Sequence, residues 1–491
     1  MLLIGKRRLY VIGIDSAPLW IIKKLYRKYK MEGFGRFLEN DALREMESTI
    51  PPVTAAAWPT IYTGKHPKDH GIMDFLYIDR NYTRQLIYYE PEKHRPFWEE
   101  LASKGKKCLV VTPAMVLQKS RSKNVDMITG WPLQPSYNSK ELESAAKKFG
   151  FTGEPDIGVG LDKGEISLAK AVDMYEKSMR ARSELSKHLI RKNNYDMAFV
   201  CFTETDRIQH YALNRNDWEK YAAPLYKAAS DFIEWVLEYS KKDRDSAIMI
   251  VSDHGAQPVR DKFLVNSWLI DNGYAALKSE KAAAHKKGAV HSAKRYVSER
   301  IMKLKIRRAV YNRMPAFMKR SVEKMIDESL EEAQDSEHVK IQEADFDMPR
   351  TKAFAAVSYG PIGMIWLNDR RFSRPSLNGF AARKTKAEII TKLKRLKTRD
   401  GSILVNRVLD GSRYYSNAKT FIPPDIIIEL ATGIITDFSY YSKSGIFMRP
   451  EMHRSGDHSR NGVFGSQNMG SSRSEMKIGD IRDAVIGYLI G

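Results

Sequence analysis

The chain has 491 residues, of which 43% are hydrophobic and 10% aromatic, a composition typical of a globular protein. It contains two cysteines, Cys108 and Cys201, each in an apolar run, so a disulfide-built secreted fold is excluded and buried free thiols are expected. The formal net charge of +21 favours anionic partners such as nucleic acid, phosphorylated metabolites or an anionic membrane surface, but also suits a merely soluble basic protein.

The sequence carries no signal for a membrane or for export. No apolar run approaches the ~18 to 20 residues that a membrane span requires. Near the N-terminus, Lys6, Arg7 and Arg8 interrupt the apolar stretch that a secretory signal would need. We therefore expect a soluble, cytoplasmic protein, with an unusual export route left open.

The first predicted strand is the apolar run RLYVIGI at Arg8 to Ile14, which is typical of a strand buried on both faces. Asp15 follows directly, and open α/β sheets bind their ligands at the carboxyl ends of their strands. The alternative is that Asp15 caps the helix predicted over 20–30, with Pro18 just inside it.

The next informative stretch is STIPPVTAAAWPTIYTGKHPKDHGIMDF at Ser48 to Phe75. Thr54 directly precedes a helix-compatible run from Ala55 to Tyr62, which is the position of an N-cap. The same position places its hydroxyl beside unpaired backbone N–H groups and the positive end of the helix dipole, where a nucleophile attacking phosphate would lie. This stretch alone does not decide between the two roles.

Two further buried strands end in residues that can bind metals. The run YDMAFVCFT leads into Glu204–His210, where helical spacing would place Asp206 and His210 on one face. The run SAIMIV ends at Asp253-His254-Gly255. Each motif is weak alone, because a surface Asp/His pair and an isolated Asp-His dipeptide are both common.

The remaining elements alternate between helix and strand. Helices are predicted over 96–104, 168–192, 218–239, 385–397 and 477–489, and strands over 107–112, 353–357, 363–367, 403–408 and 426–430. A turn-rich loop is expected over 453–462. Residues 277–344 form a basic segment with helical periodicity, which could contact a membrane surface or nucleic acid, or could be a lid packed on the core.

These separate signals converge. In a mainly parallel sheet the strand ends share one edge, so Asp15, Asp206 and Asp253 would meet there. Together with three histidines they provide two mixed oxygen and nitrogen sites that suit Zn²⁺, and also Mn²⁺ or Fe. A pair of metals is the standard clamp for displacement at phosphorus. The histidines of this set are His210, His254 and His458.

This ensemble resembles the alkaline phosphatase superfamily, specifically its type I phosphodiesterase/nucleotide pyrophosphatase family. The motifs that carry the resemblance occur in the family's order and span nearly the whole chain: VIGID at 11–15, PPVTAAAWPTIYTGKHPKDHGIMDF at 51–75, TETDRIQH at 203–210, SDHG at 252–255, PPDIII at 423–428 and GDHSRNGVF at 456–464. The resemblance implies an α/β fold, with a mainly parallel central sheet flanked by helices.

By this resemblance, the domains are a core over 1–276, a basic helical insertion over 277–350 and the rest of the core over 351–491. Thr54 would be the nucleophile and form a covalent phospho-threonine, while the backbone N–H of Ala55 would bind a phosphoryl oxygen. One metal would be held by Asp15, Thr54, Asp253 and His254, and the other by Asp206, His210 and His458.

The chain departs from the family at Asp74, where nucleotide pyrophosphatases have an asparagine that binds a phosphate oxygen. Asp74 is therefore a substrate-binding candidate that puts pyrophosphatase activity in doubt. His458 is preferred to His453 because Asn461-Gly462 follows it as in the family. The alternatives are a phosphomonoesterase, phosphomutase or phosphonate hydrolase on the same core, or a basic protein that binds nucleic acid or a membrane surface and has a vestigial core.

Overall fold

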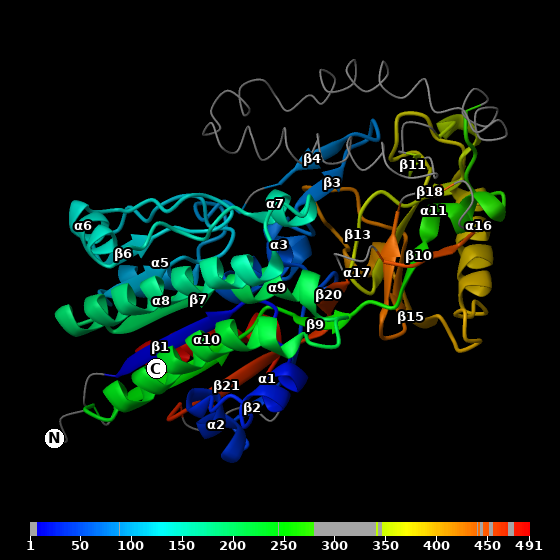
Figure 1. Ribbon diagram of the computed structural model, residues 1–491. Helices are drawn as coiled ribbons and strands as arrows, with labels where there is room; N and C mark the ends of the chain where they lie inside the picture. Colours follow the sequence, from blue (N-terminus) through cyan, green and yellow to red (C-terminus); the bar gives the residue numbers. More distant parts are fainter. Residues whose placement is uncertain are drawn as a thin grey trace. The chain divides into compact units, whose positions relative to one another are not determined.

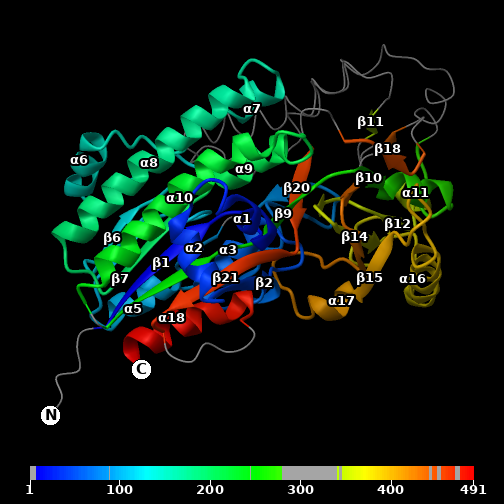
Figure 2. The same ribbon diagram turned by 60° about the horizontal axis from the view of Figure 1, so that its bottom comes forward.

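The computed structural model describes residues 7–87, 89–243, 245–278, 340–341, 346–438, 440–441, 445–450, 455–469 and 476–491 (Figures 1 and 2). Their contacts group them into two compact units. The first comprises residues up to Asp74, from 89 to Val259 and from 455 onward, and the second comprises residues 75–87 and 260–450. Most of the insertion predicted over 277–350 lies outside the described residues, so its boundaries stay predictions.

A seven-stranded sheet forms the centre of the first unit, in the order β2-β21-β8-β1-β7-β5-β6. The strands from β8 to β6 run parallel, and β21 and β2 add an antiparallel edge. A separate two-stranded ladder joins β9 and β20. The bounds are β1 Arg8–Ile14, β2 Leu43–Glu47, β5 Cys108–Val111, β6 Val125–Ile128, β7 Met197–Phe202, β8 Ser246–Val251, β9 Gly255–Pro258, β20 Gly456–Ser459 and β21 Asn461–Gln467.

Helices lie on both sides of this sheet, as Figure 2 shows for α8 and α10 on one side and α5 and α18 on the other. The bounds are α1 Leu19–Leu25, α2 Glu32–Glu39, α3 Thr54–Thr63, α4 Pro67–His70, α5 Phe97–Ser103, α6 Lys140–Lys148, α7 Gly158–Asp162, α8 Leu168–Lys192, α9 Glu204–Ala212, α10 Glu219–Ser240, and α18 Ile481–Ile490 after a 3₁₀ turn over Ile478–Asp480. This arrangement confirms the predicted α/β fold with a mainly parallel sheet flanked by helices.

The central strands are apolar throughout because both of their faces are covered. On β1, Tyr10 packs edge-on against Tyr239 of α10, with the rings 6.4 Å apart. On the opposite face, Phe199 of β7 packs against Trp58 of α3, Phe97 and Trp98 of α5. Successive strand residues point to opposite faces, so one apolar run serves two separate layers of core.

The second unit is built on a five-stranded sheet and smaller ladders. Its main sheet has the order β12-β14-β16-β15, with β13 paired to β14, and a three-stranded sheet has the order β17-β10-β19. The bounds are β3 Leu76–Ile78, β4 Arg84–Leu86, β10 Asp261–Leu264, α11 Val265–Asp271, β11 Lys340–Ile341, a 3₁₀ turn Met348–Arg350, β12 Ala353–Phe354, β13 Ser358–Tyr359, β14 Ile362–Leu367, α16 Gly379–Leu393, β15 Val405–Asp410, α17 Gly411–Tyr414, β16 Ile426–Leu430, β17 Ile434–Asp437, β18 Tyr440–Tyr441 and β19 Phe447–Met448.

Several elements differ from their sequence predictions, and three of these differences are described here. The helix predicted from residue 385 begins six residues earlier, because the Asn378 side chain accepts a hydrogen bond from Ala381 N and caps α16 there. The helix predicted over 20–30 ends at Leu25. The loop predicted over 453–462 contains β20 and the start of β21, since Gly456 and Gly462 allow close backbone approach there, while residues 451–454, including His453, lie outside the described residues.

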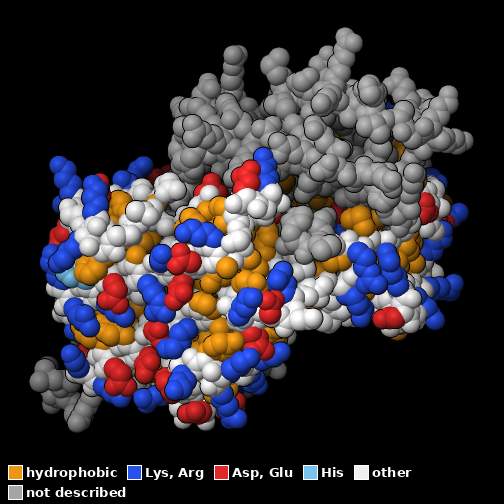
Figure 3. Space-filling model, in the orientation of Figure 1, with side chains coloured by type: hydrophobic (Ala, Val, Ile, Leu, Met, Phe, Trp, Pro, Cys, Tyr) orange, Lys and Arg blue, Asp and Glu red, His pale blue; other side chains and the backbone are white. Residues whose placement is uncertain are grey.

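Positive and negative side chains are mixed over the face of the first unit seen in Figure 3. Along α8 they form pairs one helical turn apart, such as Lys177 with Asp173 at 3.0 Å and Arg180 with Glu176 at 2.8 Å. The net positive charge is therefore not gathered into one patch on this face. In the described ranges, no helix combines the length and the apolar character needed to cross a bilayer.

Candidate active site

Three neighbouring parallel strands each deliver an aspartate to the same edge of the sheet. The strand β1 lies between β7 and β8, with Ile14 opposite Phe202 and Gly13 opposite Val251. Asp15 follows β1, Asp206 lies in the first turn of α9 just after β7, and Asp253 follows β8. All three are at most 2% exposed. The structure thus brings together the carboxylates that the strand ends predicted.

The first group of candidate ligands surrounds the imidazole of His254. Its Nε2 lies 3.2 Å from Asp253 Oδ2 and 3.6 Å from Asp15 Oδ1. The Thr54 hydroxyl lies 3.3 Å from the same nitrogen. Ligand atoms of Asp15, Asp206 and His254 also fall within 4.8 Å of one another, so Asp206 borders this group.

The second group consists of Asp206, His210 and His458. Asp206 Oδ1 lies 3.5 Å from His210 Nε2 and 3.3 Å from His458 Nε2. Asp206 and His210 are four residues apart on α9, so they share one helix face as the sequence predicted. His458 arrives on β20, and its ring lies 4.0 Å from that of His254, which places the two groups side by side.

Each of the three histidines is oriented by a backbone carbonyl. His254 Nδ1 lies 3.1 Å from Gly255 O, His210 Nδ1 lies 3.0 Å from Gly456 O, and His458 Nδ1 lies 2.9 Å from Pro52 O. An Nδ1–H that donates to a carbonyl leaves the Nε2 lone pair directed at the carboxylates. This is the orientation that metal-ligating histidines adopt.

Thr54 is the first residue of α3, and the predicted cap position is wrong by one residue. Val53 is the N-cap residue, and Thr54 Oγ1 makes no capping bond but faces His254 instead. The N–H groups of Ala56 and Ala57 bond to Val53 O, whereas Thr54 and Ala55 stand ahead of these first helical bonds. Both residues are buried.

Asp74 lies beyond the HGI segment, three residues after Gly71, and is 1% exposed. Its burial means that any phosphate contact by Asp74 would be made from inside the protein. His70, four residues earlier, serves the fold: its Nε2 lies 3.0 Å from Thr60 Oγ1, and its Nδ1 accepts from Ile72 N at 3.2 Å. Because the Thr60 hydroxyl already donates to Ala56 O, His70 must donate from Nε2 and is neutral.

The electrostatics of the two groups differ. Burial, together with the carboxylates of Asp253 and Asp206, raises the pKa of Asp15 well above its usual range. Burial also raises the pKa of Asp253 to about 7. Burial acts on Asp206 in the same direction, but His210 and His458 in their protonated forms outweigh it and hold its pKa well below the usual range, whereas a bound cation would take the place of the protons on Nε2.

The donor set fits divalent cations. Asp15 Oδ1 and Asp253 Oδ2 are buried, and no hydrogen-bond donor among the described residues reaches either oxygen. Both oxygens face the Nε2 lone pair of His254, and burial lowers the pKa of this histidine well below its usual value. Lone pairs that converge in a buried place repel one another unless a cation lies among them. Carboxylate and imidazole are ligands that Zn²⁺, Mn²⁺ and Fe share.

A comparison with known protein families identifies the family of this chain. The model of the type I phosphodiesterase/nucleotide pyrophosphatase family matches residues 9–372. The chain belongs to this family. The matched range contains six of the seven predicted metal-site residues, and the seventh, His458, is brought to them by β20. Membership of this family supports hydrolysis of a phosphate ester.

The solved structures of one enzyme, phosphonoacetate hydrolase, support the fold. Phosphonoacetate hydrolase from Sinorhizobium meliloti 1021, in complex with phosphonoformate, is 14% identical with a TM-score of 0.58, over 99% of this chain and 96% of that one. Its complex with phosphonoacetate is 13% identical with the same TM-score and coverage. Murine ectonucleotide pyrophosphatase/phosphodiesterase 5 is 10% identical with a TM-score of 0.46, over 98% and 95%. No curated protein matches the sequence.

Sequence reasoning overlooked Trp58 in this family member. Its indole Nε1 donates to Asp15 Oδ2 at 3.1 Å, so it fixes the oxygen of Asp15 that faces away from His254. The signal was available, because Trp58 is one helical turn after Thr54 on α3. Gly13 makes room for it, since a Cβ there would lie 2.8 Å from the indole ring.

A second set of overlooked residues begins with Arg207. Its Nη1 donates to Asp206 Oδ2 at 3.0 Å. No local pattern indicated this contact, because adjacent helix positions do not face each other. The residues that hold Arg207, Glu154 and Trp131, come from a distant segment.

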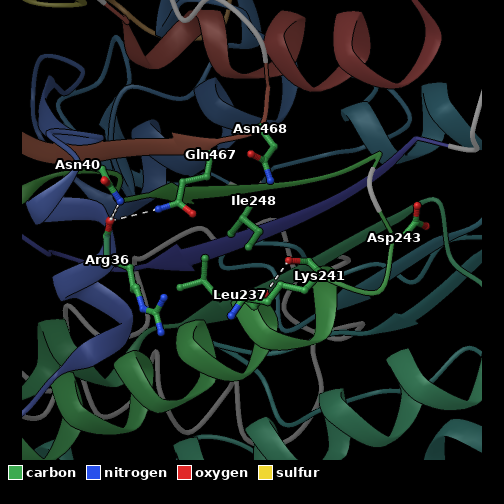
Figure 4. A pocket seen from close by; sticks show the side chains of 9 residues that line it. Arg36, Asn40, Leu237, Lys241, Asp243, Ile248, Gln467 and Asn468 are labelled. Carbon is green, nitrogen blue, oxygen red and sulfur yellow. Dashed lines mark hydrogen bonds between the residues drawn. The ribbon is translucent and has the colours of Figure 1, made fainter.

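The cavity shown in Figure 4 lies elsewhere in the first unit and contains none of the predicted site residues. Asn40 and Gln467 both donate to the Arg36 carbonyl at its wall, at 2.7 and 3.2 Å. Lys241 beside it is already paired with Glu238 at 2.7 Å. The polar groups named here already have partners, and none of the candidate metal ligands lies in this cavity.

Proposed function

We propose that the protein hydrolyses phosphate esters with Thr54 as the nucleophile. The observation that supports this most is the position of the Thr54 hydroxyl, 3.3 Å from His254 Nε2 at the start of a helix and beside two groups of candidate ligands. A helix N-terminus attracts the phosphate, and its N–H groups, including that of Ala55, suit a phosphoryl oxygen. The proposed nucleophile and the proposed binding site of the phosphate therefore lie at the same end of α3.

Two divalent cations complete the proposed centre, and Zn²⁺ suits the mixed ligands best, with Mn²⁺ or Fe as alternatives. Asp15, Thr54, Asp253 and His254 would hold one ion. Asp206, His210 and His458 would hold the other. When bound, the ions would favour ionisation of a hydroxyl and offset the negative charge of the phosphoryl group.

The proposed reaction has two displacements at phosphorus. In the first, a bond forms between Thr54 Oγ and phosphorus while the bond from phosphorus to the leaving alcohol breaks, which gives phospho-Thr54. In the second, a water oxygen bonds to phosphorus and the bond to Thr54 Oγ breaks, which restores the hydroxyl. The alcohol takes up a proton, and phosphate or a phosphate monoester leaves.

The decisive variant is Thr54→Ala. We expect hydrolysis of an activated aryl phosphate ester to fall by at least about 10³-fold, because no other hydroxyl replaces the nucleophile. Metal content, measured by elemental analysis, should stay close to that of the wild type, since six protein ligands remain. Thr54→Ser is the matched control and should keep part of the activity. Full activity in Thr54→Ala would refute the mechanism.

The class of ester is a separate question. The likeness to phosphonoacetate hydrolase motivates phosphonate hydrolysis as the second candidate, and Asp74 disfavours nucleotide substrates. A panel of an aryl phosphate diester, an aryl monoester and phosphonoacetate, each assayed with Zn²⁺ and with Mn²⁺, separates these activities. If Asp74 contacts the phosphate, Asp74→Asn should shift the panel toward diesters, since it removes a negative charge near the substrate.

The non-enzymatic alternative places the function in the basic segment predicted over 277–344, as a contact to nucleic acid or to an anionic membrane surface. Its signature would be salt-sensitive binding that survives Asp253→Asn and His254→Asn. Hydrolysis that depends on Thr54 would exclude a purely binding role.

A further inference from the structure

Arg207 is the guanidinium that lies against the second group of candidate ligands. Its Nη1 donates to Asp206 Oδ2 at 3.0 Å, and its Nε donates to Glu154 Oε1 at 3.0 Å. Its guanidinium carbon lies 4.0 Å from the centre of the Trp131 ring. The planar group is thus fixed at two edges and on one face, which an ammonium could not reproduce.

The contact with Arg207 gives the two oxygens of Asp206 different partners. Oδ1 faces His210 Nε2 and His458 Nε2, while Oδ2 is taken by Arg207. A free carboxylate has two equivalent oxygens and can rotate to present either. With Oδ2 held, Asp206 presents a single oxygen in a fixed direction.

Glu154 and Trp131 anchor the arginine from outside α9. The Glu154 side chain is 6% exposed and also accepts a hydrogen bond from the hydroxyl of Thr203, at the end of β7. Both residues lie in the segment between β6 and α8. The chain of contacts therefore runs from the end of β7 through Glu154 to Arg207 and Asp206.

Arg207 is placed to act through Asp206 and not on the substrate. Its remaining nitrogen, Nη2, is buried and meets no hydrogen-bond acceptor among the residues that the structure describes. A nitrogen that is closed off from solvent cannot receive a phosphate oxygen without movement of the whole side chain. The geometry supports a positioning role.

We propose that Arg207 is a positioning residue for Asp206, that it presents Oδ1 to the cation shared with His210 and His458, and that Glu154 and Trp131 hold Arg207 in place. This inference rests on the proposed two-cation centre. It assigns to the segment between β6 and α8 a share in building that centre.

Metal affinity tests the proposal without recourse to activity. The protein is stripped with a chelator and titrated with Zn²⁺ against a chromophoric competitor, so that two equivalents are resolved, and the equivalent that His458→Ala weakens is identified as the second one, which belongs to Asp206, His210 and His458. In Arg207→Gln we expect the second equivalent to bind about 10- to 100-fold more weakly, the usual effect of losing the group that orients a ligand, and the first to be unchanged. Arg207→Lys should lie between Arg207→Gln and wild type.

A second variant checks that the arginine acts as part of a chain of contacts. Glu154→Gln should weaken the same equivalent, and the double variant should be no weaker than Arg207→Gln alone, because both changes release one carboxylate. If the losses of Zn²⁺ affinity in the two single variants add up in the double variant, Glu154 does not act through Arg207, and this part of the proposal is wrong. Wild-type affinity in Arg207→Gln would overturn the positioning role itself.

Arg371 supplies the matched control, since it is a partly buried arginine paired with Asp369 and Asp425, which are not candidate ligands. Arg371→Gln should lower the melting temperature without weakening the second equivalent selectively. An equal loss there would mean that any disturbed arginine has this effect, and would overturn the proposal. If the wild-type protein itself fails to bind two equivalents, the proposed function is refuted together with this inference, whereas wild-type affinity in Arg207→Gln refutes only this inference.

Discussion

At the scale of single residues, the site is organised by small polar contacts that leave one atom of each side chain directed inward. Backbone carbonyls hold the Nδ1 atoms of three histidines, and an indole N–H holds one oxygen of Asp15. Such contacts restrict rotation before any ligand arrives. The conformational entropy of these side chains is therefore lost during folding, and less entropy is lost when a ligand binds.

The indole contact leads to a prediction at this scale. Trp58→Phe keeps most of the buried ring but removes the donor to Asp15 Oδ2, and a hydrogen bond to a charged group is worth about 1.5–3 kcal/mol. We expect the Zn²⁺ equivalent that belongs to Asp15, Asp253 and His254 to bind roughly 10- to 100-fold more weakly. The measurement is the same competitive titration.

Trp98→Phe is the control for this prediction, because Trp98 is equally buried in the same aromatic cluster and its ring lies 4.8 Å from that of Tyr62. Equal affinities in the two variants would show that the indole N–H does not contribute to the site.

At the scale of elements, an ion pair joins α8 to α9 at the end of β7. Arg182 Nη1 and Nη2 donate to the two oxygens of Glu204 at 2.9 and 2.7 Å, and both side chains are at most 1% exposed. Nη1 also donates to Cys201 O. The pair thus fixes the helix that carries Asp206 and His210 against its neighbour.

Breaking this pair should be costly. Arg182→Met leaves the Glu204 carboxylate buried without its cation, so we expect the free energy of unfolding to fall by about 3–5 kcal/mol in urea denaturation. The double variant Arg182→Met with Glu204→Gln should recover much of this loss, because no charge then remains unpaired. A loss below about 1 kcal/mol in the single variant would contradict the prediction.

The elements also show how far sequence reasoning reaches. The strands β1 and β8 were predicted with their observed ends, because apolar runs such as RLYVIGI and SAIMIV indicate strands buried on both faces. The convergence of Asp15, Asp206 and Asp253 followed from the parallel arrangement. In contrast, the strand β21 has the sequence NGVFGSQ, whose glycines suggest a turn, and it forms because β2 and β8 offer ladders on both sides.

Within the site, too, contacts between distant segments could not be predicted from local sequence patterns. The position of Thr54 at the start of α3 was predicted to within one residue, but its contact with His254 depends on strand order. The contacts of Arg207, Glu154 and Trp131 were not predicted, because contacts between distant segments produce no periodic pattern in the sequence.

At the scale of the whole molecule, buried titratable groups tie stability to pH. Both cysteines are buried free thiols, as predicted. Burial lowers the pKa of His70 to about 3, below the usual value near 6.5. The neutral form therefore belongs to the folded state, and the unfolded chain takes up a proton first as the pH falls.

We accordingly expect His70 to contribute to acid lability. Its contribution is fully present above about pH 6.5 and is lost progressively as the pH falls toward 3, which amounts to about 2 kcal/mol between pH 7 and pH 5. His70→Gln should show a smaller decrease of unfolding free energy over this interval, measured by urea denaturation with chelator present throughout. An identical decrease in both proteins would contradict the assignment.

The place of His458 on β20, which pairs with β9, has a consequence for biosynthesis. This histidine lies in the last tenth of the chain, whereas Asp15 and Thr54 lie near its beginning. During translation, every other candidate ligand emerges from the ribosome before His458. A nascent chain can therefore assemble at most the group around His254, and the second group closes only when β20 pairs with β9. The proposed hydrolysis would therefore not begin before His458 has been synthesised.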